Sequence, residues 1–198
     1  MIPDPDAMIF LAKKLETAAH RQGWDQEATL GIVFDIDGGY RTTPFPAQPA
    51  ELDPNPAMGL LMLAEGLYRN TGYARRQIRE HNAESGGRDL AGLWFISEGW
   101  MRPPELADDE RAAADIPGTK EVRFLTLLDC AGVTYNVQRV RGEKPTMEVI
   151  KPGCSELETH GNVFDGLRRM LLALGSNMPD GSIDMEAVAT VGTEGDME

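Results

Sequence analysis

Two groups of charged residues have the types and spacing that binding or catalysis would need. Asp35 and Asp37 stand at the end of residues 28–36, an apolar run rich in β-branched side chains that predicts a buried strand. Three arginines lie farther along the chain, between residues 75 and 79. The first group presents carboxylates where a strand leaves the core. The second presents guanidinium groups, which hold carboxylates and phosphates through paired hydrogen bonds.

The segment Gly-Ile-Val-Phe-Asp-Ile-Asp-Gly, residues 31–38, resembles the first motif of the haloacid dehalogenase-like phosphohydrolases. In that family the two aspartates leave the end of a strand in a parallel sheet, and their carboxylates share a Mg²⁺ ion. By this resemblance Asp35 would be the nucleophile and Asp37 the general acid/base. The resemblance implies a Mg²⁺-dependent phosphohydrolase.

The remaining motifs of that family have only isolated counterparts. Ser97 follows an apolar run, as a second motif would, and the candidates for a phosphate-binding lysine are Lys120, Lys144 and Lys151. The nearest counterpart of the fourth motif, residues 175–180, follows a predicted helix and lacks the acid beside the glycine. Asp-x-Asp-Gly-Gly is also ordinary turn composition. We therefore interpret these residues as a chain reversal and keep the phosphohydrolase as the alternative.

The arginines favour a binding surface. A helix is predicted over about 72–84, and Arg75 and Arg79 lie one turn apart on it, with Arg76 on the neighbouring ridge. A positive face on an acidic molecule can hold an acidic protein segment or a phosphate-bearing ligand. Alternatively, the face is merely solvated and balanced by the acids at 105–115. We take Arg75, Arg76 and Arg79 as the candidate binding residues, with another protein as the expected partner.

The rest of the chain supplies the elements that must position these groups. Apolar side chains at helical spacing predict helices over 6–22, from Pro56 to about Leu67, over 72–84 and over 160–174. Strands are predicted over 28–36, 90–101, 120–128, 133–141 and 146–151. The proline-rich stretch 43–56 and the acidic stretch 103–118 predict surface loops. This order predicts an α+β fold, with a mostly antiparallel sheet of about four to five strands packed against three to four helices.

The clearest local prediction is a β-hairpin. The runs 120–128 and 133–141 are separated by Asp-Cys-Ala-Gly, a short turn that ends in glycine. Val140 is out of phase with the alternation of the second run, which predicts a bulge. Trp94 and Trp100 are expected in the core.

Composition limits the classes of partner. The chain carries 32 acidic and 19 basic residues and a formal net charge of −13, which repels phosphate backbones and anionic lipids. Neither nucleic acid nor a membrane is therefore expected as a partner. Two cysteines, Cys130 and Cys154, form no disulfide framework and favour reduced thiols in the cytoplasm. The three histidines are scattered, at positions 20, 81 and 160, so we expect no metal site and no cofactor.

The predicted organisation is one α+β domain over 1–176, followed by a disordered acidic tail over 177–198. The sequence contains no complete catalytic set. We therefore expect a non-enzymatic protein-binding or regulatory protein that acts through a surface contact with another protein.

Overall fold

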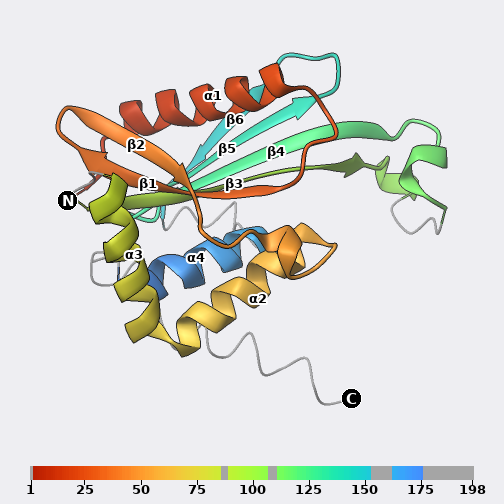
Figure 1. Ribbon diagram of the computed structural model, residues 1–198. Helices are drawn as coiled ribbons and strands as arrows, with labels where there is room; N and C mark the ends of the chain where they lie inside the picture. Colours follow the sequence, from red (N-terminus) through yellow and green to blue (C-terminus); the bar gives the residue numbers. More distant parts are fainter. Residues whose placement is uncertain (1, 86–88, 107–110, 153–161, 176–198) are drawn as a thin grey trace.

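The structure, a computed structural model, describes residues 2–85, 89–106, 111–152 and 162–175. Within them, six strands form one sheet in the order β2-β1-β3-β4-β5-β6, and every neighbouring pair is antiparallel. Helix α1 runs along one face of the sheet, and α2, α3 and α4 lie against the other (Figure 1). The predicted α+β fold is confirmed, with more strands than expected.

Apart from one additional edge strand and three short 3-10 turns, the elements follow the predicted order with small changes at their ends. The strands are β1 (Thr29–Ile36), β2 (Gly39–Pro44), β3 (Leu90–Met101), β4 (Lys120–Asp129), β5 (Thr134–Val140) and β6 (Thr146–Ile150). The α-helices are α1 (Pro5–Gln22), α2 (Pro56–Arg69), α3 (Thr71–Ser85) and α4 (Asn162–Leu174). Short 3-10 turns are η1 (Pro49–Glu51), η2 (Pro104–Leu106) and η3 (Ala113–Asp115).

The central strands are apolar on both faces because helices cover both sides of the sheet. On β1, Ile32 and Phe34 point into the core beneath α2, α3 and α4, whereas Val33 belongs to the core beneath α1. Neighbouring β3 divides in the same way, with Phe95 on the first side and Trp94 on the second. A continuous apolar run is what a strand with two covered faces requires, since successive side chains alternate between the faces.

Helix α1 packs through Met8, Leu11 and Ala12 and is held to β5 by one buried ion pair. Asp4 caps the helix, and Pro5 takes the first helical position.

Both carboxylate oxygens of Glu16 accept hydrogen bonds from Arg139, with 2.8 Å between Nη2 and Oε2. Glu16 is only 1% exposed. A buried carboxylate is tolerated when a guanidinium satisfies both of its oxygens. The hydrogen bond to Glu16 raises the pKa of Arg139, so the guanidinium of this ion pair remains charged.

The other core is formed where α2 and α4 cross closely. A Cβ atom on Gly166 of α4 would lie 2.9 Å from Leu60 Cγ of α2, so a glycine is needed for this approach. Helix α3 adds Ala74 and Ile78 to the same core. The opposite side of α3 is exposed to solvent and carries Arg75, Arg76 and Arg79.

Three predictions are corrected by the structure. Residues 39–44, partly inside the predicted loop 43–56, form the edge strand β2, which ends in Pro44 where no further ladder bond is needed. The register of β4 with β5 runs without a shift through Val140, so no bulge is present there. Trp100 is 50% exposed, because it stands near the end of β3 beyond the reach of α1; Trp94 is buried as expected.

The predicted hairpin is confirmed. Strands β4 and β5 pair antiparallel from Val122↔Val140 to Leu128↔Thr134, and Gly132 in their turn has φ +82°. That backbone region favours glycine. The predicted tail, residues 177–198, lies outside the described residues. No helix in the described part of the chain is long and apolar enough to span a membrane.

Candidate functional site

The twin aspartates lie at the turn between two antiparallel strands. Asp35 is paired with Tyr40 across the β1–β2 hairpin, and the backbone N–H of Asp35 donates to the carbonyl of Asp89 at 2.8 Å. Asp37 is exposed in the turn itself, next to Gly38 with φ +84°. The described strands contain none of the parallel pairing that the phosphohydrolase resemblance implies.

Ser97, Lys120 and Lys144 lie at the other end of the sheet from the aspartates. Lys151 follows β6 at the same end as the aspartates, but on the opposite edge of the sheet, four strands away from β1. Because β1 and β3 are antiparallel and Thr29 pairs with Ile96, Ser97 is found beyond the start of β1, whereas Asp35 is near its end. Six strand residues separate those positions, a distance of about 20 Å. Lys120 is equally remote and pairs with Glu143 at 3.1 Å. Residues 176–180 of the fourth-motif candidate lie outside the described residues. Among the residues that are described, the structure does not bring together the set that the resemblance implies.

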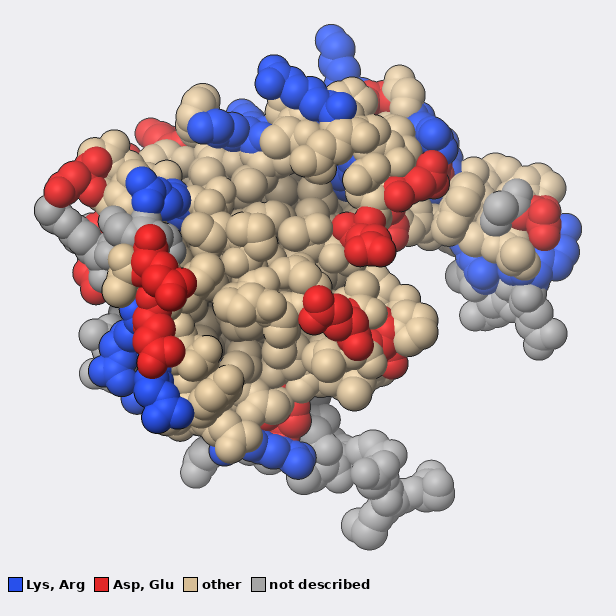
Figure 2. Space-filling view, in the orientation of Figure 1, with Lys and Arg blue, Asp and Glu red and all other residues tan. Residues whose placement is uncertain are grey.

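The three candidate binding residues share the exposed ridges of α3. Ala74 and Ile78 anchor the helix in the core, which turns Arg75, Arg76 and Arg79 outward. Basic side chains are visible over the region of α3 at the lower left of Figure 2, beside acidic ones. Arg76 lies over the ring of Tyr73, with Cζ 5.7 Å from the ring centroid.

Arg75 and Arg79 line a pocket of about 460 Å³ between α3, the end of α4 and the start of β3. Apolar side chains form much of its wall, and the polar groups converge from α3 and from the residue before β3. Its lining consists of Phe34, Arg75, Ile78, Arg79, Asn82, Asp89, Leu90, Leu174 and Gly175. We call this cavity the arginine pocket. Apolar and polar side chains contribute to its lining in similar measure, and two of the polar groups are guanidinium groups.

Backbone groups of α3 and of the end of α4 contact the two arginine side chains of the pocket. Arg79 Nε donates to the carbonyl of Arg75 at 3.2 Å. Arg75 lies against the end of α4, since a Cβ atom on Gly175 would be only 2.8 Å from Arg75 Nε. Both side chains are therefore placed by the fold and still reach solvent.

Within the described residues, Arg75, Arg76 and Arg79 form no ion pair with a carboxylate. Other arginines of the molecule do, and Arg69 with Glu65 at 2.8 Å is the nearest example along the chain. In a chain with a net charge of −13, cations without such partners are conspicuous. Their remaining donors are available to an anionic ligand.

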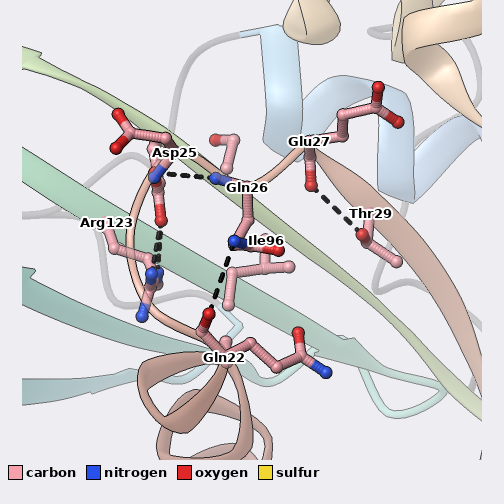
Figure 3. A pocket seen from close by; sticks show the side chains of 10 residues that line it. Gln22, Asp25, Gln26, Glu27, Thr29, Ile96 and Arg123 are labelled. Atoms are coloured by element: carbon pink, nitrogen blue, oxygen red, sulfur yellow. Dashed lines mark hydrogen bonds and ion pairs between the residues drawn. The ribbon is translucent and has the colours of Figure 1, made fainter.

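A second pocket, of about 320 Å³, opens where the loop after α1 crosses β3 and β4 (Figure 3). Its polar groups are largely used to fasten the loop. Glu98 Oε2 accepts the backbone N–H groups of Asp25, at 2.6 Å, and Gln26, at 3.2 Å. Its other oxygen accepts from Arg123, which also donates to the carbonyl of Gly23. Asp25 has φ +66°, a strained conformation that these bonds maintain.

Three carboxylates meet beside this second pocket. Oxygens of Asp25, Glu98 and Glu121 lie within 4.8 Å of one another, a grouping that could hold a hard cation. Glu98 is already bound to Arg123 and Glu121 to Arg141. The two guanidinium groups offset most of the negative charge, so we regard the cluster as the anchor of the loop.

Sequence reasoning missed this anchor. Arg123 is 1% exposed, directly opposite Glu98 across the β3–β4 ladder, and its guanidinium lies 4.7 Å from the centroid of the Trp24 ring. The alternation of inward and outward side chains along β4 could have revealed the buried arginine. Arg123 shares the phase of the buried Leu125 and Leu127, and a charge at such a position needs a buried partner.

His81 and Cys130 have structural surroundings. His81 Nε2 is 2.9 Å from Thr43 Oγ1 and joins α3 to β2. Cys130 is a free, buried thiol whose Sγ donates to the carbonyl of Leu90, and burial raises its pKa to about 12. A thiol with that pKa is a poor nucleophile at neutral pH. His160 and Cys154 lie outside the described residues.

No family model, no curated protein and no solved structure matches the chain. By its structure, the chain is an α+β protein with a six-stranded antiparallel sheet and an arginine-lined pocket at the junction of α3, α4 and β3.

Proposed function

We propose that the protein is a non-enzymatic binding protein that holds an acidic segment of another protein at the arginine pocket. The proposal rests on the position of Arg75 and Arg79 and on their lack of carboxylate partners among the described residues. Both line a pocket with an apolar wall, and neither forms an ion pair with a carboxylate in the described part of the chain. A sequence with only two cysteines and no disulfide framework favours a reducing compartment, and we therefore place this binding in the cytoplasm.

The pocket indicates what the segment should contain. Guanidinium groups one helical turn apart suit two carboxylates on an extended peptide, since each can accept two parallel N–H···O bonds. Ile78, Leu90 and Leu174 offer contact to an apolar side chain between those carboxylates. Asp89, on the rim, disfavours a second negative charge on its side of the pocket and so limits the orientation of the peptide.

The test uses a labelled peptide in which two acidic residues flank one leucine, followed by fluorescence anisotropy. We expect the double variant Arg75→Glu and Arg79→Glu to weaken binding at least about tenfold, the loss of roughly one charge-assisted hydrogen bond. Both arginines are exposed, so the fold should survive, as thermal unfolding would verify.

The matched control is Lys13→Glu with Lys14→Glu. These lysines are exposed on α1, on the opposite face of the sheet, and the change in net charge is identical. The control should bind the peptide with nearly unchanged affinity. Equal weakening in both double variants would show that only the overall charge matters, and the proposed site would then be wrong.

A further inference from the structure

We propose that the acidic tail, residues 177–198, binds the arginine pocket of its own chain and competes with the acidic partner segment. The inference rests on the proposed function, because it assigns a competitor to the same site. Three observations lead to it: where the described chain leaves α4, the charges that follow, and the side chains between those charges.

The chain leaves the described structure at the pocket. Leu174 and Gly175, the last described residues, both line it. Gly175 has φ +82°, which ends α4, and its backbone is in contact with the Arg75 side chain. Asp180 follows Gly175 by five residues. Five residues span at most about 17 Å, so this part of the tail cannot lie far from Arg75 and Arg79.

The charges of the tail complement those of the pocket. Residues 177–198 contain acids and neither lysine nor arginine; the acids are Asp180, Asp184, Glu186, Glu194, Asp196 and Glu198. The first three lie closest to Gly175 and enclose Ile183 and Met185. Acids around apolar side chains are the pattern that the walls of the arginine pocket favour, with Ile78 and Leu90 facing the apolar groups.

Because the tail and the pocket belong to one chain, even a weak contact between them can be well populated. A short linker raises the local concentration of a tethered segment to the millimolar range. An acidic partner must therefore displace the tail. Its apparent dissociation constant rises in inverse proportion to the fraction of molecules in which the pocket is free.

The experiment compares two neutralised variants of the full chain. The proximal variant carries Asp180→Asn, Asp184→Asn and Glu186→Gln. The distal variant, matched for charge, carries Glu194→Gln, Asp196→Asn and Glu198→Gln. The Nε–Hε signals of Arg75 and Arg79 in ¹H–¹⁵N spectra report the contact directly, and the labelled acidic peptide reports competition.

The proximal variant should shift both arginine signals and tighten peptide binding about fivefold, as expected if the tail occupies the pocket in four molecules of five. The distal variant should change neither quantity appreciably. Unchanged arginine signals and unchanged peptide affinity in the proximal variant would overturn the inference, as would equal effects of the two variants.

Failure of the inference can be told apart from failure of the proposed function. If the peptide binds through Arg75 and Arg79 but neither tail variant alters binding or signals, the proposed function stands and the tail contact is wrong. If the signals respond to the proximal variant but the peptide never binds, the tail contact stands and the proposed function is wrong.

Discussion

Asp129 shows at the scale of one residue how this fold closes its central hairpin. Its Oδ1 accepts the backbone N–H groups of Ala131, at 2.8 Å, and Val133, at 2.9 Å, and its Oδ2 accepts the hydroxyl of Tyr135 at 3.1 Å. The side chain is 1% exposed. Every one of these donors is left without its acceptor if the carboxyl group is removed, so the turn between β4 and β5 depends on it.

Replacing Asp129 should therefore lower the free energy of unfolding by an amount that depends on the new side chain. We expect Asp129→Ala to lower the free energy of unfolding by about 3 kcal/mol, because buried donors lose their acceptor. Asp129→Asn keeps an oxygen for the two N–H groups and should cost about 1 kcal/mol. Urea unfolding at neutral pH measures both, and equal costs would show that the hydrogen bonds do not support the turn.

The same carboxyl group gives a pH dependence. Burial raises the pKa of Asp129 above 3.8, although its hydrogen bonds oppose the change. Just above pH 3.8 the folded state therefore binds more protons than the unfolded state, and stability from this group falls as pH rises through that window. The advantage of the native protein over Asp129→Asn should shrink accordingly with rising pH, and an advantage that grows would contradict the direction of the shift.

At the scale of an element, α2 contains two glycines with opposite surroundings. A Cβ atom on Gly59 would lie 2.1 Å from the carbonyl oxygen of Pro49, in the 3-10 turn that packs against the helix. A Cβ atom on Gly66 would have no atom within 4 Å. Gly59 thus permits the close approach of two backbones, whereas Gly66 only weakens the helix.

The two substitutions should consequently change stability in opposite directions. Gly59→Ala should lower the free energy of unfolding by about 1–3 kcal/mol, because the backbone of Pro49 must move. Gly66→Ala should raise it by up to about 1 kcal/mol through better helix propensity. Thermal unfolding separates the two, and a Gly59→Ala protein as stable as the native one would mean that η1 is not fixed against α2.

The elements also show what the sequence could and could not predict. Helix α2 and the β4–β5 hairpin have strong local signals, a cap with apolar periodicity in one and a glycine-ended turn in the other, and both predictions are confirmed. Strand β2 has no such signal, because its side chains are mostly polar and its existence depends on pairing with β1.

Likewise, one part of the candidate site could be predicted from the sequence and another part could not. The spacing of Arg75 and Arg79 predicts neighbouring side chains on α3. Their pocket could not be predicted, because its other walls come from Leu90 and from Leu174 and Gly175, which are distant in the sequence. Similarly, the burial of Arg123 depends on its pairing with Glu98 across two strands.

At the scale of the whole molecule, charge sets a condition on the proposed binding. A net charge of −13 repels an acidic partner at long range, so attraction must come from short-range contacts with guanidinium groups. The long-range repulsion is screened over about 8 Å at physiological ionic strength. Binding at the arginine pocket should thus be governed by the sign of two side chains and not by the charge of the molecule.

Reversal of charge on both partners tests that claim most directly. The Arg75→Glu and Arg79→Glu variant is titrated with the labelled acidic peptide and with a peptide in which lysines replace its acids. The variant should lose the acidic peptide and bind the lysine peptide more tightly than the Lys13→Glu and Lys14→Glu variant does, although the two carry the same net charge. Equal affinity of the two variants for the lysine peptide would contradict a binding site at the arginine pocket.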